Sequence, residues 1–119
     1  MILVDTSVWV DHLRSSHAQL RSLLDRDMVV THPFVVGELA CGSLKNRERI
    51  ISDIRALPAA TVAAQDEVLR FVEERRLWNE GLGWIDVHLL ASALLSNCRL
   101  LTLDRSLLAA ATAMGLSYS

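Results

Sequence analysis

The chain has 119 residues, of which 51% are apolar and 22% are charged, so it fits one folded domain that we expect to span residues 1–119. A disordered or low-complexity chain is excluded, because such chains carry too few apolar residues to offset the entropy lost on folding. Twelve basic and fourteen acidic residues give a net charge of −2. The overall charge therefore does not favour binding to nucleic acid or to an anionic membrane, and any binding to a polyanion has to be local.

The two cysteines, Cys41 and Cys98, fit no zinc-binding spacing, and the four histidines are scattered along the chain. This usage is typical of a reducing compartment. The N-terminal sequence shows no basic segment followed by a cleavage site, and no apolar run approaches the roughly 20 residues that span a bilayer. We therefore expect a soluble, cytoplasmic protein.

Apolar runs and capping residues predict the elements of the first half of the chain. Residues 2–4 form a continuous apolar run, typical of a strand that is covered on both faces, and the Asp-Thr-Ser that follows can cap a helix to about Arg14. The pattern then predicts a helix around 20–24, a strand at 28–31, a helix from Pro33 to Gly42, and a charged helix from about Lys45 to Pro58.

The second half continues the alternation of helices and strands. It predicts an amphipathic helix at 61–76, a break at Gly81 and Gly83, an apolar helix at 85–96, a strand at 99–103, and a helix at 105–114 that Gly115 closes. The connections between strands are too long for hairpins. The sheet should therefore be parallel and the fold class α/β.

Four carboxylates stand where folding alone would not place them. Asp5 ends the first predicted strand and Asp104 the last, and the carboxyl ends of parallel strands meet at one edge, where α/β proteins bind ligands. Asp86 enters the most apolar helix, and Glu38 lies within another apolar helix, where an unpaired carboxylate is costly to bury. We expect the four side chains to face one crevice.

Each acid also has a simpler structural explanation. Asp5, Asp86 and Asp104 can cap helices, and Glu38 can form a salt bridge with a distant Arg. Taken together, the four favour a cation site, because converging carboxylates repel one another unless a cation lies among them. Oxygen-only ligands select Mg²⁺ or Mn²⁺ rather than zinc. Such an ion binds phosphate oxygens and activates water, so a nuclease is the leading functional class.

Several other side chains are candidates for supporting roles. The hydroxyls of Thr6, Ser7 and Thr102 adjoin the strand-end acids and can orient a ligand, although capping is the more common role of such residues. His88 is a candidate general base, but a hydrogen-bonded core histidine is the favoured explanation. Trp84, beside a glycine-containing loop, is a candidate RNA contact, although large aromatic residues are more often core or interface residues.

The four acid-bearing segments match a known pattern in order and spacing. They read Ile-Leu-Val-Asp-Thr-Ser at the N-terminus, Val-Val-Gly-Glu-Leu-Ala around Glu38, Gly-Trp-Ile-Asp-Val-His around Asp86, and Leu-Leu-Thr-Leu-Asp-Arg-Ser-Leu around Asp104. In this combination the whole chain resembles the PIN-domain ribonucleases, in particular the VapC-type toxins of toxin–antitoxin pairs. The acidic metal-binding set of that family would fall on Asp5, Glu38, Asp86 and Asp104.

The resemblance implies a Rossmann-like α/β/α sandwich around a central, mainly parallel sheet. It also implies an endoribonuclease that depends on Mg²⁺ or Mn²⁺ and cuts RNA with metal-activated water, a homodimer, and inhibition by a VapB-type antitoxin whose C-terminal segment lies across the active-site groove. Some family members carry a further acid or amide shortly after the aspartate that matches Asp104, where this chain has Arg105 and Ser106. Asp104 would then be the least secure metal ligand. The resemblance leaves open whether the site binds one ion or two.

Two other functions compete with the nuclease. A phosphoacceptor receiver domain has a similar size, opens with Ile-Leu-Val-Asp and binds Mg²⁺. It needs a second acid beside the first, a phosphoacceptor at a mid-chain strand end and a late Lys, whereas here Thr6 follows Asp5, Asp53 lies in a helical pattern and the single lysine is Lys45. The third hypothesis is a catalytically inactive PIN fold that serves as a protein-binding module, which the presence of all four acids disfavours.

The high apolar content and the apolar helix at 34–40 independently predict a homodimer. Dimerisation would bring a basic cluster from each chain, Lys45, Arg47 and Arg49, near the acidic grooves. That cluster would attract phosphate locally despite the net charge of −2.

Overall fold

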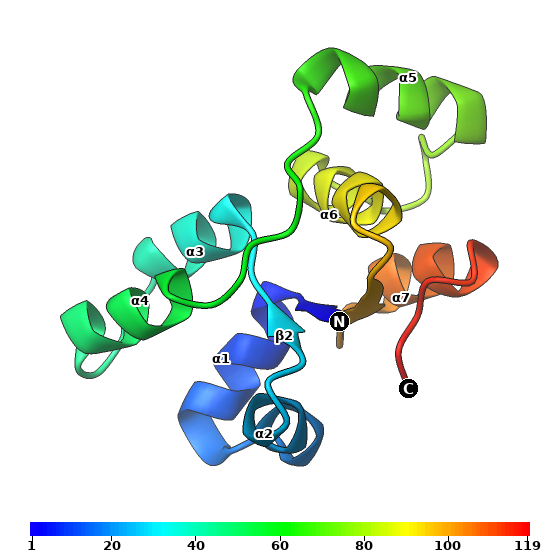
Figure 1. The fold of residues 1–119 in the computed structure, drawn as a ribbon. Helices are drawn as coiled ribbons and strands as arrows, with labels where there is room; N and C mark the ends of the chain where they lie inside the picture. Colours follow the sequence, from blue (N-terminus) through cyan, green and yellow to red (C-terminus); the bar gives the residue numbers. More distant parts are fainter.

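A computed structural model describes residues 1–119, and strands alternate with helices along the chain. The elements in order are β1 (Ile2–Val4), α1 (Thr6–Ser15), α2 (Ala18–Asp25), β2 (Val29–Val30), α3 (Pro33–Ala40), α4 (Arg47–Arg55), α5 (Gln65–Arg75), α6 (Trp84–Leu95), β3 (Arg99–Leu101) and α7 (Arg105–Ala113) (Figure 1). This order confirms the predicted α/β class.

The three strands form a parallel sheet in the order β2-β1-β3. Ile2 of β1 lies opposite Val29 of β2 and Arg99 of β3, so the first strand is central. After β1 the chain first forms β2 on one side of it and later crosses over to form β3 on the other side. The switch point of the sheet therefore lies at the carboxyl end of β1, which is where open α/β sheets bind ligands.

Helices cover the sheet on both sides. In Figure 1, α1 and α2 lie on one side of the strands, and α6 lies on the other side with α5 beyond it. Leucines from five elements are fully buried between these layers: Leu3, Leu20, Leu89, Leu100 and Leu107. Burying each such side chain contributes about 1.5–3 kcal/mol to folding. None of the helices combines the length and the apolar composition required to cross a bilayer.

The last strand ends earlier than the apolar pattern predicts. β3 stops at Leu101 instead of residue 103, because side-chain hydroxyls take the next backbone groups: the Leu103 N–H donates to Ser7 Oγ (3.0 Å) and the Asp104 N–H to Thr102 Oγ1 (3.0 Å). Such local bonds compete with the sheet ladder. Asp104 therefore lies three residues past β3, which corrects the expectation that it ends the strand.

Several helix boundaries also differ from the expectation, and α4 spans Arg47–Arg55 instead of about 45–58. The helix predicted from residue 61 begins at Gln65, because the Thr61 N–H donates to Ser96 Oγ (2.7 Å) and the Ala64 N–H to Glu67 Oε1 (2.9 Å). The helix predicted to end at Gly42 ends at Ala40, and Gly42 has no positive φ. By contrast, the predicted glycine closure of α7 is confirmed at residue 115, where φ is +70°.

Candidate active site

Asp5 follows β1 at the switch point and is the most deeply buried of the four predicted acids, with 6% of its surface exposed. It is the N-cap residue of α1, but its side chain makes no capping bond. Its Oδ2 instead accepts hydrogen bonds from Ser7 Oγ (2.6 Å) and Thr102 Oγ1 (2.8 Å). Two of the predicted supporting hydroxyls therefore fix the Asp5 carboxylate, and capping by its side chain is wrong.

Glu38 joins this region through the third predicted hydroxyl. Thr6 Oγ1 donates to Glu38 Oε1 at 2.6 Å, which links the start of α1 to α3. Glu38 pairs with no Lys or Arg, so the salt-bridge explanation is wrong; the ion pair in the chain joins Arg49 to Asp53 at 3.8 Å on the surface. The Glu38 side chain is also exposed, which corrects the expectation that it is buried inside an apolar helix.

Asp86 and Asp104 both cap helices, as their simpler explanation predicts. The Gly83 N–H donates to Asp86 Oδ2 at 2.8 Å at the start of α6. The Leu107 N–H donates to Asp104 Oδ1 at 2.9 Å at the start of α7. A capping bond occupies one carboxylate oxygen and leaves the other, so it does not exclude a second role.

All four acids share one bonding pattern. Each uses one carboxylate oxygen to bond its own chain, while the other oxygen accepts no hydrogen bond from the protein. The unused atoms are Asp5 Oδ1, Glu38 Oε2, Asp86 Oδ1 and Asp104 Oδ2. The four side chains are thus held in place, and each keeps one anionic oxygen that is free to bind a ligand.

The charges of three of the acids influence the fourth, Asp86. Burial raises the pKa of Asp86, the Gly83 N–H opposes this by lowering it, and the charges of Asp104, Asp5 and Glu38 raise it further. Interactions between separated charges weaken with distance and are screened beyond roughly 8 Å at physiological salt. Asp86 therefore lies within electrostatic range of the three other acids.

The donor chemistry of this region fits a hard divalent cation. As the side chains stand, no group of three or more His, Cys, Asp or Glu is spaced to hold a metal ion. A full protein cage is not required, however, because Mg²⁺ keeps several waters and commonly binds through one or two carboxylates. The unused anionic oxygens have no basic partner, so their chemistry suits such an ion.

His32 is a buried polar residue that the sequence pattern did not single out. It follows β2 and caps α3: its Nδ1 accepts from the Phe34 N–H (3.0 Å), so its Nε2 carries the proton and donates to Ser92 Oγ (3.0 Å). Burial, and next the neighbouring His88, lower the pKa of His32 to about 4. The His-Pro pair at the predicted start of this helix was the available signal.

The prediction for His88 is half right. The side chain is buried, with 1% exposed, but neither ring nitrogen has a hydrogen-bond partner. Its ring packs against Trp84 (4.7 Å between centroids) and Phe34 (4.6 Å). Burial also lowers the pKa of His88. An imidazole enclosed in this way is not placed to act as the general base.

The depressed pKa of His32 predicts acid-sensitive stability. The free energy of unfolding should be highest above pH 6.5, fall as the pH drops from 6.5 to about 4, and level off below that, because within this range the unfolded chain binds a proton that the folded chain does not. A shift from 6.5 to about 4 corresponds to roughly 3 kcal/mol. Denaturant unfolding between pH 7.5 and 4 measures this, and an Asn substitution at this position should flatten the slope. An equally steep slope in His32→Asn would contradict the assignment.

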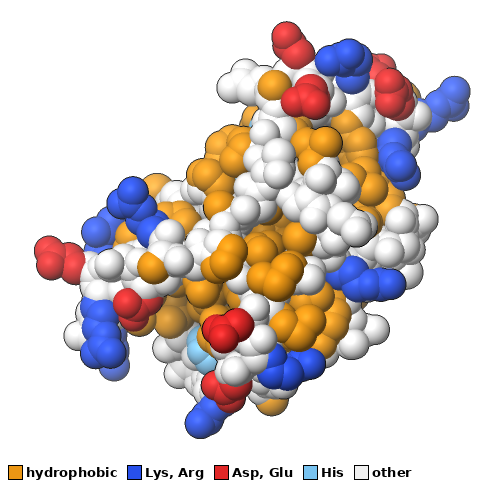
Figure 2. Space-filling view, viewed as in Figure 1, with side chains coloured by type: hydrophobic (Ala, Val, Ile, Leu, Met, Phe, Trp, Pro, Cys, Tyr) orange, Lys and Arg blue, Asp and Glu red, His pale blue; other side chains and the backbone are white.

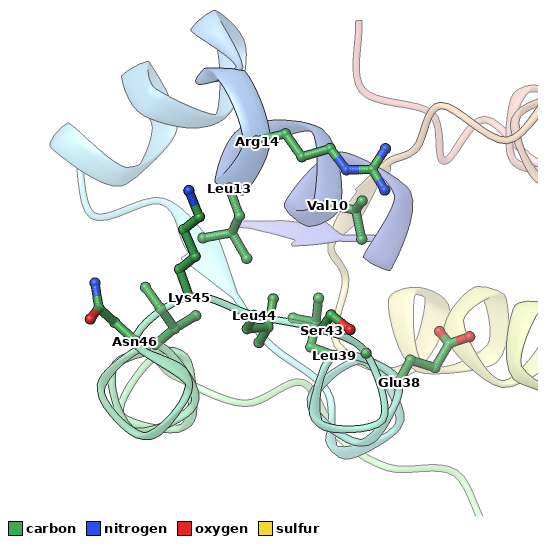
Figure 3. A pocket seen from close by; sticks show the side chains of 11 residues that line it. Val10, Leu13, Arg14, Glu38, Leu39, Ser43, Leu44, Lys45 and Asn46 are labelled. Atoms are coloured by element: carbon green, nitrogen blue, oxygen red, sulfur yellow. The ribbon is translucent and has the colours of Figure 1, made fainter.

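A cavity of about 720 Å³ opens beside Glu38, between α1, α3 and the start of α4. In Figure 3, Glu38 lies at one end of the cavity toward α6, and Arg14 and Lys45 border it elsewhere. The apolar side chains that line the cavity are Val10, Leu13, Leu39, Leu44 and Ile50. The groove next to the acids is therefore apolar at its base and basic at its border.

Only part of the predicted basic cluster lies at this groove. Lys45 lines it, whereas Arg47 donates to the Ala40 carbonyl (2.9 Å) and Arg49 pairs with Asp53. A basic side chain thus reaches the groove beside Glu38 within a single chain.

The sequence profile of the PIN domain family matches residues 2–113, a span that includes all four acids. The chain belongs to the PIN domain family. This PIN domain is 48% identical to Ribonuclease VapC32 of Mycobacterium tuberculosis, in strains CDC 1551 and H37Rv, over 120 aligned residues that cover 100% of this chain and 97% of the relative. The predicted VapC-type PIN resemblance is therefore confirmed.

A solved structure agrees on the fold. The crystal structure of PAE2754 from Pyrobaculum aerophilum matches with a TM-score of 0.61 at 22% identity, covering 91% of this chain and 77% of the other. The predicted α/β PIN architecture is confirmed by this match together with the family profile.

Proposed function

We propose that this PIN-domain protein is an endoribonuclease that requires Mg²⁺ or Mn²⁺ and acts as the toxin of a toxin–antitoxin pair. The observation that carries the proposal is the group of four carboxylates at the switch point, each fixed through one oxygen and open at the other. The 48% identity to a ribonuclease over the full chain supports RNA as the substrate. A phosphoacceptor receiver function has no such support.

The proposed site contains metal ligands and residues that orient these ligands. Asp5, Asp86 and Glu38 would hold the ion, with Asp104 as the least secure ligand. When bound, the ion supplies positive charge to a phosphate oxygen and lowers the pKa of water.

The supporting groups fix the ligands before RNA arrives. Ser7 and Thr102 keep the Asp5 carboxylate in place, and Thr6 holds Glu38 beside it. Because these bonds already exist in the folded chain, little side-chain freedom is lost when the ion and the RNA bind.

A direct assay tests the function. The purified chain is incubated with single-stranded RNA in Mg²⁺, in Mn²⁺ and in EDTA, beside an Asp66→Asn control that changes an exposed acid of α5. Cleavage should appear with either ion, disappear in EDTA and persist in the control. RNA binding without any cleavage would instead support an inactive PIN fold that serves as a binding module.

A VapB-type antitoxin is the proposed protein partner. The cavity beside Glu38 supports this, because its apolar lining suits side chains of a peptide segment and Glu38 itself lines it. Pockets of roughly 300–1,000 Å³ are typical of ligand sites. A segment seated there would block access to Glu38 and so inhibit the enzyme.

A homodimer is the proposed assembly, but the apolar helix at 34–40 does not support it, because Val35 and Leu39 are buried in the chain's own core. Support comes from another surface, where Val62, Leu94 and Leu95 are 48%, 38% and 52% exposed. The Thr61 N–H bond to Ser96 Oγ brings the first beside the other two. Figure 2 shows hydrophobic side chains across the middle of one face, with charged groups at its α4 and α5 ends.

Light scattering should therefore give twice the 13.2 kDa chain mass at micromolar concentration. Leu95→Glu should shift the mass toward the monomer, because a charge would be buried at the interface. Leu103→Glu, which changes a leucine of the same 52% exposure elsewhere, should leave the dimer intact. A monomeric wild-type protein would contradict the assembly.

A further inference from the structure

A row of aromatic rings leads from the core to the surface beside Asp86. His32 packs against Phe34 (5.2 Å between ring centroids), Phe34 against His88 (4.6 Å), and His88 against Trp84 (4.7 Å). The two histidines are buried, whereas Trp84 is 40% exposed. Trp84 is thus the surface end of a row that is otherwise held inside the protein.

The ring geometry leaves part of Trp84 open to a planar ligand. The planes of Trp84 and His88 are nearly perpendicular, at 84°, so the imidazole can cover at most one face of the indole. Both nitrogens of His88 are buried without a partner, which costs free energy that an apolar side chain would avoid. The edge contact with His88 therefore restrains Trp84 on the inner side and leaves 40% of its surface exposed.

The row lies next to the acidic site. Trp84 precedes Asp86 by two residues in the first turn of α6, so the two backbone positions are close although the side chains leave the helix in different directions. Phe34 and Glu38 are four residues apart on α3 and so share one face of that helix. Figure 3 shows Glu38 extending toward α6. The exposed indole is therefore at the edge of the region where the four carboxylates gather.

We propose that Trp84 is the stacking platform for an RNA base adjacent to the cleaved phosphate; this inference rests on the proposed ribonuclease function. Without a bound ion the four carboxylates repel the phosphate backbone, and no Lys or Arg pairs with them. Base stacking on an aromatic ring supplies attraction that does not depend on charge, and unpaired RNA bases are commonly recognised in this way. Trp84 would thus anchor single-stranded RNA where the local charge opposes it.

Steady-state kinetics on a short single-stranded RNA in Mg²⁺ test the proposal. Trp84→Ala should raise KM about 5- to 150-fold, the range for losing one stacked base, with little change in kcat. Trp84→Phe should recover most of the loss because it keeps a π face. Trp78→Ala, which removes the other exposed tryptophan (50% exposed), should leave KM unchanged.

Fluorescence gives a readout that needs neither cleavage nor a folded alanine variant. Trp9 is buried, so in a Trp78→Phe protein Trp84 is the exposed tryptophan. Titration with the same RNA in EDTA should quench its emission, and the Trp78→Phe/Trp84→Phe protein should lose that response.

The outcomes separate the two proposals. A wild-type protein that cuts no RNA would overturn the function itself. Cleavage with an unchanged KM in Trp84→Ala and no quenching would overturn only the stacking role. A Trp84→Ala protein with unchanged KM but half the mass in light scattering would assign Trp84 to an interface between two copies of the chain.

Discussion

Replacing Asp5 by Asn should lower RNA cleavage by about 100-fold or more while leaving the circular dichroism spectrum unchanged. The amide oxygen can still accept the bonds from Ser7 and Thr102, so the local structure is kept, but the free anionic oxygen is lost. Mutating even the groups that orient a metal ligand typically costs 10–100-fold, and losing the ligand itself should cost more. Asp66→Asn provides the matched control. Near-normal activity in Asp5→Asn would remove this residue from the site.

Replacing Asp86 by Asn should raise the melting temperature in EDTA at neutral pH and reduce the further gain on adding Mg²⁺. The raised pKa of Asp86 means that the folded chain disfavours its charge, and the amide oxygen can still accept the Gly83 N–H. In the wild type, an ion that binds only the folded state at 100 times its Kd adds about 2.7 kcal/mol.

The sign of the Asp86→Asn effect separates the two roles of this residue. The advantage of the variant should grow as the pH rises from 3.8 through the raised folded-state pKa, since below that range both states carry a proton. A residue that only caps α6 would behave oppositely, because Asn loses about 0.3–1 kcal/mol of charge–dipole stabilisation. Melting curves in EDTA and in millimolar Mg²⁺ decide this. A destabilised variant with an undiminished Mg²⁺ shift would assign Asp86 to capping alone.

The strands and most helices could be predicted because their signals are local. The apolar run before Asp5 and the glycine at residue 115 each mark an element without reference to distant residues. The end of β3 could not be predicted in this way. It depends on the Ser7 hydroxyl, which reaches the Leu103 N–H from 96 residues away in the sequence.

The identities of the four acids were predictable, but their environments were not. Chain position suggested that Asp5 and Glu38 were unusual, whereas the bonds from Thr102 and Thr6 that hold them arise only on folding. The ring contacts of His88 have the same origin, since Trp84 is local to it but Phe34 comes from another helix. Sequence patterns identify candidate groups, and tertiary packing determines which of them are held and which are exposed.

Analysis of the RNA ends after cleavage tests the central claim most directly. If the acids serve to direct water at the phosphorus, the products formed in Mg²⁺ should carry a 5′-phosphate and a 3′-hydroxyl, and EDTA should abolish them. Mass spectrometry of a short RNA cut by the wild type, with Asp5→Asn in parallel, measures both properties. Products that end in a 2′,3′-cyclic phosphate, or cleavage that continues in EDTA, would show attack by the ribose 2′-hydroxyl and contradict a metal-dependent hydrolase.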